Sequence, residues 1–146
     1  MSLGHRKVAI LVEDTYEDME LWYPYYRLRE EGVAVDLVGP EAGQTYKSKH
    51  GYPAETKLAV KDIKVNDYDA VIIPGGYSPD RMRRHREMVD FVYDAVKHGV
   101  IVAAICHGPW MLCTPGLLEG RCITSYFSIR DDVINAGAEW VDTDVV

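Results

Sequence analysis

The sequence has few cysteines, and none is spaced for a metal site or a disulfide framework. Three cysteines occur in 146 residues, which is an odd number, and no C-x-x-C pair is present. This count and spacing argue against both a disulfide scaffold and a tetrahedral zinc site. We therefore expect a reducing, cytoplasmic environment and no bound metal, in which a lone cysteine is a candidate nucleophile.

Long apolar runs and an excess of positive charge are also missing. No stretch of about 18 apolar residues occurs, so neither a membrane span nor an export signal is predicted. The net charge of −7 disfavours nucleic acid and anionic membrane surfaces as partners. The chain has no internal repeat or linker, and its 146 residues fit one domain spanning 1–146.

Short apolar segments alternate with helical patterns along the chain. A strand–helix–strand order requires parallel strands with right-handed crossovers, which predicts an α/β fold, a three-layer sandwich with a mostly parallel central sheet. We predict strands at 7–13, 33–40, 68–76, 100–106, 121–126 and 139–146, helices at 17–32, 80–97, from 107 onward and at 128–137, and a hairpin or loop at 47–56.

The segment "AAICHG" (103–108) places a cysteine where a strand turns into a helix. Such a turn presents one side chain beyond the sheet edge, and it requires small residues two positions before and after that side chain. Ala104 and Gly108 meet this requirement around Cys106. A thiol at a helix N-terminus is expected to have a lowered pKa. We predict that Cys106 is a nucleophile, whereas the other two cysteines are expected to be structural.

Several polar groups are expected near Cys106, because the carboxyl ends of parallel strands form ligand sites. His107 fits either a general base or a backbone donor to an oxyanion. Gly75 and Gly76 fit either an oxyanion hole or an ordinary tight turn. One buried acid could serve as proton donor or base, but the pattern does not choose among Glu13, Asp14, Glu17 and Asp18.

Four segments together resemble the ThiJ/PfpI superfamily, most closely its PfpI-type intracellular peptidases. The resemblance implies a flavodoxin-like sandwich of the kind found in class I glutamine amidotransferases, and a homodimer or larger homo-oligomer. It also implies that relatives continue with another strand and a last helix, so part of the fold is expected to lie outside this chain. The segments are "EDTYEDMELWYPYYRL" (13–28), "PGGYSPDR" (74–81), "AICHGPW" (104–110) and "TSYFSIRDDVINAGAEWVD" (124–142).

The resemblance also assigns roles to individual residues. Glu17 is implied to be a protonated acid that contacts the thiol. His107 is implied to pair with an acid of a neighbouring subunit, and this sequence offers Asp80 where the family more often has glutamate. The other implied site residues are Cys106 as nucleophile, Gly75 and Gly76 as the oxyanion turn, and Tyr126 near the pocket.

Two classes of function follow. The first, which the resemblance implies, is a cysteine enzyme acting on reactive dicarbonyls, as a glyoxalase or deglycase, or on peptides. Both reactions begin with attack of a thiolate on a carbonyl carbon, and a pocket crowded by Tyr16, Trp110 and Tyr126 would favour small carbonyls. The second is a redox sensor or stress chaperone that uses oxidation of Cys106. A glutamine amidotransferase is excluded because no histidine follows His107 in the sequence. No cofactor is implied.

Overall fold

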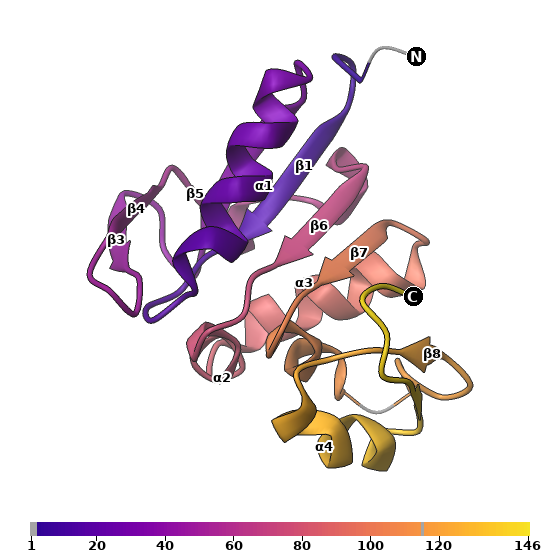
Figure 1. Ribbon diagram of the computed structural model, residues 1–146. Coiled ribbons are helices and arrows are strands. Elements are labelled where there is room, and N and C mark those ends of the chain that lie inside the picture. Colours follow the sequence, from indigo (N-terminus) through magenta and orange to yellow (C-terminus); the bar gives the residue numbers. More distant parts are fainter. Residues whose placement is uncertain (1–2, 115) are drawn as a thin grey trace.

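The computed structural model describes residues 3–114 and 116–146, and its centre is a parallel sheet of five strands in the order β5-β2-β1-β6-β7 (Figure 1). Helices α1 (Asp18–Glu30) and α3 (Arg86–Lys97) cover the two faces of this sheet. The predicted flavodoxin-like three-layer sandwich is confirmed. The strands are β1 (Lys7–Leu11), β2 (Ala34–Gly39), β5 (Leu58–Ala59), β6 (Ala70–Ile73) and β7 (Ile101–Ala104).

Strand β1 lies in the middle of the sheet and separates two hydrophobic cores. Val8 and Ile10 belong to the core under α1, whereas Ala9 and Leu11 belong to the core under α3. Successive side chains of a strand point to opposite faces, so a nearly continuous apolar run buries both sides. This buried strand fixes the position of the loop that follows it, which carries the acidic cluster of the sequence.

Two small sheets flank the central one. The antiparallel pair β3 (Gln44–Lys47) and β4 (Pro53–Thr56) shows that the hairpin or loop predicted at 47–56 is a hairpin, which begins at Gln44, before the predicted start. The strands β8 (Cys122–Ile123) and β9 (Glu139–Trp140) pair only with each other, in parallel, and both are shorter than predicted. The remaining elements are α2 (Ser78–Met82), α4 (Arg130–Asn135), η1 (Val60–Asp62), η2 (Val65–Asp67), η3 (Gly108–Leu112) and η4 (Phe127–Ile129).

The prediction of a single helix at 80–97 is wrong in one respect. This part of the chain forms two helices, α2 and α3. The break falls before α3, where His85 has an extended backbone (φ −102°, ψ 107°). From this position the Nε2 atom of His85 lies 2.8 Å from Oε2 of Glu13, a carboxylate that is only 7% exposed. A buried carboxylate is costly without a partner, so this contact accounts for the interruption.

The carboxyl ends of β1, β6 and β7 meet at one edge of the sheet, as expected for parallel strands. The loops after these three strands therefore lie together, although they are far apart in the sequence. Among the helices within 3–114 and 116–146, none is long and apolar enough to cross a membrane.

Candidate active site

Cys106 lies two residues beyond β7 in a backbone conformation that a non-glycine residue rarely adopts. Its φ is +59°, and Thr15 (φ +63°) is the other such residue in the described part of the chain. The turn is tight, because a Cβ atom on Gly108 would lie 2.5 Å from the carbonyl oxygen of Ile73. Strained backbone of this kind is frequent at functional sites. The predicted sharp turn, with glycine required two residues after the cysteine, is present.

Hydrogen-bonding groups surround the sulfur of Cys106. The backbone N–H groups of Gly76 and His107 donate to it, and Nδ1 of the His107 ring lies 3.2 Å away. On its other side, the Nε2 atom of this imidazole lies 3.1 Å from Oγ of Ser128. The adjacent thiol and imidazole therefore do contact each other, and Ser128 is a member of the site that the sequence analysis missed.

The acid that lies against the thiol is Glu20, not Glu17. The Glu20 carboxyl hydrogen-bonds to the Cys106 thiol, and its Oε2 atom accepts the N–H of Gly75 at 2.7 Å. Glu17 immediately precedes α1 and pairs with Lys49. The helix begins at Asp18, so Glu20 lies in its first turn and reaches the end of β6, whereas Glu17 remains at the rim. This corrects the contact predicted for Glu17.

The two glycines of the "PGG" turn have different roles in the structure. A Cβ atom on Gly75 would lie 2.7 Å from both Cβ of Cys106 and Oε2 of Glu20, so only glycine fits there. The N–H of Gly75 is engaged by Glu20, and the N–H of Gly76 is directed at the sulfur. Of the pair, Gly76 is the one whose amide could hold an oxyanion near Cys106.

The remaining predicted site residues lie at different distances from the thiol. Tyr126 donates its N–H to the carbonyl of Cys106 (2.8 Å), and its ring centroid is 5.1 Å from that of His107. Asp80, on α2, forms an ion pair with Arg84 at 2.8 Å and makes no contact with His107 of its own chain. Its predicted pairing with His107 of a neighbouring subunit stays a prediction, as does the homo-oligomer.

A pocket of about 630 Å³ opens onto the sulfur. Of the three aromatic residues considered as walls of a small pocket, Tyr126 lines it, whereas Tyr16 and Trp110 do not. Tyr16 is instead fully buried, and its hydroxyl donates to the carbonyl of Tyr52. The charged residues at the pocket wall are Glu17, Glu20, Lys49 and Asp144.

Comparison with known proteins identifies the family of this chain. A model of the DJ-1/PfpI family matches residues 6–146. The chain belongs to the DJ-1/PfpI family. It is 43% identical over 140 residues to Deglycase PfpI of Pyrococcus furiosus, covering 96% of this chain and 84% of that protein. It is 42% identical over 141 residues to the Putative cysteine protease YraA of Bacillus subtilis, covering 97% of this chain and 83% of that protein.

Solved structures agree with this membership. A two-domain protein of Anabaena variabilis with DJ-1/ThiJ/PfpI-like and ferritin-like domains superposes with a TM-score of 0.94 at 39% identity, over 97% of this chain. The chain spans 41% of that protein's length. Schizosaccharomyces pombe DJ-1 superposes with a TM-score of 0.83 at 24% identity, over 96% of this chain and 78% of that chain, and it shows the fold alone. The resemblance to ThiJ/PfpI proteins is confirmed.

The electrostatics of this DJ-1/PfpI site differ from the expectation for a thiol at a helix end. Burial raises the pKa of the Glu20 carboxyl, which favours its protonated form. Burial and the nearby Glu20 carboxylate raise the pKa of the Cys106 thiol, although two backbone amides act in the opposite direction. The predicted lowering is wrong because burial and Glu20 outweigh the backbone amides, and the segment that follows Cys106 is the five-residue 3₁₀ segment η3 rather than a long helix. Burial also lowers the pKa of His107, which favours the neutral imidazole.

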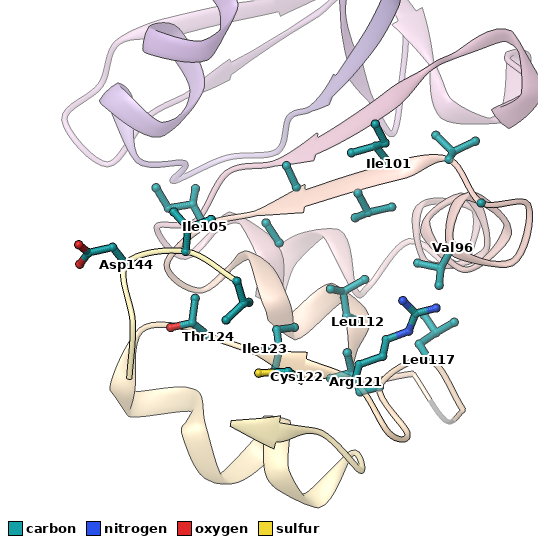
Figure 2. Close-up of a pocket in the computed structure, with 18 residues that line it drawn as sticks. Val96, Ile101, Ile105, Leu112, Leu117, Arg121, Cys122, Ile123, Thr124 and Asp144 are labelled. Carbon is teal, nitrogen blue, oxygen red and sulfur yellow. The ribbon is translucent and has the colours of Figure 1, made fainter. Parts of the chain in front are cut away.

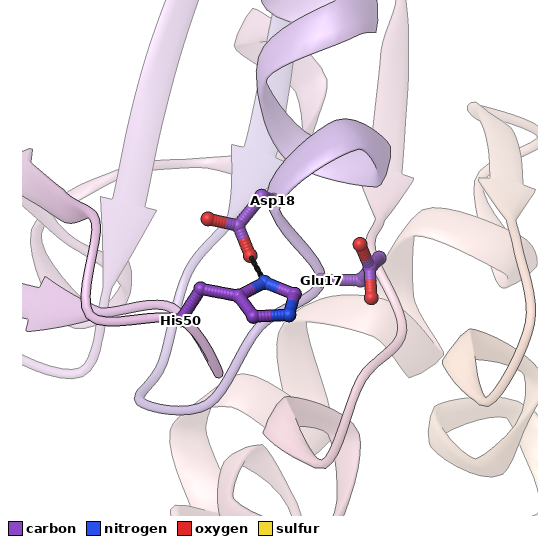
Figure 3. Close-up of side chains that lie close together, drawn as sticks. All are labelled: Glu17, Asp18 and His50. Carbon is purple, nitrogen blue, oxygen red and sulfur yellow. Dashed lines mark hydrogen bonds and ion pairs between the residues drawn. The ribbon is translucent and has the colours of Figure 1, made fainter.

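A cluster of potential metal ligands lies at the rim of the site, where single oxygen or nitrogen atoms of Glu17, Asp18 and His50 lie within 4.8 Å of one another (Figure 3). Nδ1 of His50 lies 2.8 Å from one Asp18 oxygen, and the other accepts the Ser48 hydroxyl. Glu17 is engaged by Lys49. These groups satisfy one another, so the cluster does not by itself point to a metal.

Proposed function

We propose that this chain is a cysteine-dependent enzyme that adds the sulfur of Cys106 to the carbonyl carbon of small reactive dicarbonyl compounds, in the manner of a glyoxalase or deglycase. The observation that carries the proposal is the strained position of Cys106, with two backbone N–H groups and an imidazole directed at its sulfur. The names of relatives at 43% and 44% identity, which are called deglycases, favour dicarbonyls over peptides.

The first step is proton transfer from the thiol to Nδ1 of neutral His107, followed by attack of the thiolate on the aldehyde carbon. The pKa of His107 is lowered by burial, so the imidazole is available as an acceptor. In this step Nε2 carries the ring hydrogen and donates it to Oγ of Ser128, which lies 3.1 Å away, so that Nδ1 is free to accept the proton of the thiol. The new alkoxide receives hydrogen bonds from the amides of Gly76 and His107.

The second stage moves hydrogen within the bound substrate. Protonated Glu20 gives its proton to the alkoxide, which makes a hemithioacetal, and the resulting carboxylate removes the proton from the carbon bonded to sulfur. The His107 imidazolium gives the proton that it took from the thiol to the second carbonyl oxygen, which returns His107 to its neutral form. Glu20 then delivers its proton to the neighbouring carbon and takes the proton of the first hydroxyl, which gives a 2-hydroxy thioester. Water, activated by His107, then hydrolyses the thioester, so that methylglyoxal and water become lactate and the thiol is regenerated. The overall reaction is neutral in redox terms and needs no external oxidant or reductant.

The test is consumption of methylglyoxal with formation of lactate by the purified chain. Cys106→Ser removes the nucleophile, and Cys113→Ser is the matched control, because Cys113 is also partly buried but lies away from the pocket. We expect lactate formation by the native chain and by Cys113→Ser, and loss of about 10³-fold or more in Cys106→Ser. Absence of lactate from the folded native chain would contradict the proposal.

Peptide substrates are the second arm of the test, since one relative is called a putative cysteine protease. Cysteine-dependent cleavage of peptides without lactate formation would assign the same thiol to a peptidase. If neither activity is present while peroxide converts Cys106 selectively to its sulfinate, the redox-sensor alternative is favoured.

A further inference from the structure

The pocket at Cys106 has walls from distant parts of the chain. On one side it borders a groove of about 850 Å³ between β7 and β8, with which it shares Ile105 and Thr124 as lining residues (Figure 2). Its wall also includes the loop after β1 (residues 12–17) and the turn after β6 (residues 74–77), which are hydrogen-bonded to each other. One amide that faces the sulfur belongs to this turn, so the contacts between loop and turn set its position.

The loop after β1 contains Thr15, whose φ of +63° makes it one of two non-glycine residues with left-handed backbone in the described part of the chain. For a β-branched residue this conformation is an outlier, and it persists only where the surroundings hold it. The backbone of Thr15 donates its N–H to the carbonyl of Lys47 (2.6 Å) and accepts the N–H of Tyr77 (2.9 Å). Its hydroxyl accepts Nε–H of Arg81 (3.1 Å) and donates to the carbonyl of Asp14 (2.6 Å). Every hydrogen-bonding group of Thr15 is therefore engaged.

Gly76 lies between the two strained residues. Its N–H is directed at the sulfur of Cys106, which is the other residue with left-handed backbone. On its other side, a Cβ atom on Gly76 would lie 2.5 Å from the carbonyl oxygen of Thr15. Tyr16 also pairs with Gly76 through an antiparallel bridge. The position of the Gly76 amide against the sulfur therefore depends on the conformation of Thr15.

We propose that Thr15 and Arg81 are positioning residues, which hold the Gly76 amide against the sulfur of Cys106. Arg81 lies on α2, which directly follows the turn that contains Gly76. Its hydrogen bond to the Thr15 hydroxyl, together with the bond from Tyr77 to the Thr15 carbonyl, closes a ring of contacts that restrains the turn. Neither Thr15 nor Arg81 lines the pocket, so both act through the amide and not on the substrate.

The proposal gives a definite direction for the reactivity of the thiol. Burial and Glu20 raise the pKa of Cys106, and the N–H groups of Gly76 and His107 oppose them. Displacement of the Gly76 amide should therefore raise the pKa of the thiol further and slow its alkylation by iodoacetamide at neutral pH. General loosening of the site would instead expose the half-buried thiol and speed its alkylation at every pH. The effect on the thiol is independent of the reaction, whereas the effect on turnover rests on the proposed function.

The experiment compares matched substitutions in the folded chain. Thr15→Val removes the hydroxyl and keeps the branched shape, and Thr15→Ser keeps the hydroxyl. Arg81→Met removes the guanidinium and keeps an unbranched stem, and Arg83→Met is its control, because Arg83 is an exposed arginine at the end of the same helix.

We expect alkylation of Cys106 at neutral pH to fall by about threefold to tenfold in Thr15→Val and in Arg81→Met, with its pH profile moved to higher pH. The limiting alkylation rate at high pH should be unchanged. The double variant should be no slower than either single variant, because the two side chains act through one contact. For lactate formation, kcat should fall by about tenfold to hundredfold, which is less than the roughly 10²–10³-fold cost of losing an oxyanion donor outright. Thr15→Ser and Arg83→Met should stay close to the native chain in both measurements.

Three results would overturn the proposal: an unchanged alkylation profile in Arg81→Met, faster alkylation at every pH, or an equal shift in Arg83→Met. Urea titration shows which variants are folded, and if Thr15→Val is not, the comparison of Arg81→Met with Arg83→Met decides. If the native chain forms no lactate but the alkylation profiles shift as expected, the proposed function fails and the positioning role stands.

Discussion

Replacement of Glu20 by glutamine separates the chemical role of this carboxyl from its structural one. The glutamine amide oxygen can still accept the N–H of Gly75, which Glu20 accepts at 2.7 Å, so the turn at the end of β6 should keep its geometry. An alanine there would leave that N–H without a partner, at a cost of about 1–3 kcal/mol. What glutamine cannot do is give up or take a proton. General acid–base catalysis typically contributes about 10²–10⁴-fold, so we expect kcat for lactate formation to fall by roughly this factor.

The same variant has a second readout that requires no substrate. Burial and the ionised form of Glu20 both raise the pKa of the Cys106 thiol, so a glutamine, which cannot ionise, should lower that pKa over the pH range in which Glu20 is ionised. The rate of alkylation by iodoacetamide reports the thiolate, and its rise with pH should shift to lower pH in Glu20→Gln. Alkylation at neutral pH is then faster although turnover is slower. A role of Glu20 in folding alone would not produce these opposite changes.

Glu17→Gln is the matched control for these measurements. Glu17 lies at the pocket rim, and its partner Lys49 is about half-exposed, so this pair contributes little. We expect kcat within about threefold of the native value and an unchanged alkylation profile. Equal losses in Glu17→Gln and Glu20→Gln, or a loss in Glu17→Gln alone, would refute the assignment of the acid to Glu20.

Three further predictions follow from the site. Ser128→Ala removes the hydrogen-bond partner of Nε2 of His107 and should lower the rate of Cys106 alkylation at neutral pH by about threefold to tenfold. Ser128→Thr should restore this rate, and an unchanged pH profile of alkylation in Ser128→Ala would contradict the role of Ser128. Gly108→Ala places a Cβ atom 2.5 Å from the Ile73 carbonyl oxygen and should reduce the free energy of unfolding, measured by urea titration, by roughly 2–4 kcal/mol. A native-like free energy of unfolding would contradict the claim that the turn has no room for a side chain at this position. If Asp80 acts on His107 across a subunit interface, then mixing inactive Asp80→Asn with inactive Cys106→Ser should restore activity, and additive inactivity would place Asp80 outside the site.

The fold could be predicted because burial dictates the pattern of the central strands. The apolar runs around 7–13 and 68–76 are buried on both faces, as expected for the central strands of a parallel sheet covered by helices on both sides. The bounds of the short strands at 122–123 and 139–140 are harder to predict, because these strands pair with each other and not with the central sheet. The break in the helix at His85 depends on a contact with Glu13, which is 72 residues away, so local sequence does not show it.

The site could be predicted only in part, for similar reasons. Cys106 and its glycine are marked by a local backbone requirement, which a short motif displays. The choice of acid is not local, because Glu17 and Glu20 are three residues apart and only the exact start of α1 decides which one reaches the thiol. Glu20 directly precedes the fully buried Leu21, which favours an inward position, but four other acids precede it between residues 13 and 18. Ser128 is brought to His107 by tertiary structure from 21 residues away.

The most direct test of Cys106 as the nucleophile is to follow lactate formation while the thiol is titrated with iodoacetamide. Peptide mass spectrometry measures the labelled fraction of each of the three cysteines at every point. We predict that activity falls in direct proportion to the labelling of Cys106 and reaches zero at one label per chain on that residue. Activity that persists when Cys106 is fully labelled, or that follows labelling of Cys113 or Cys122, would contradict the proposed function.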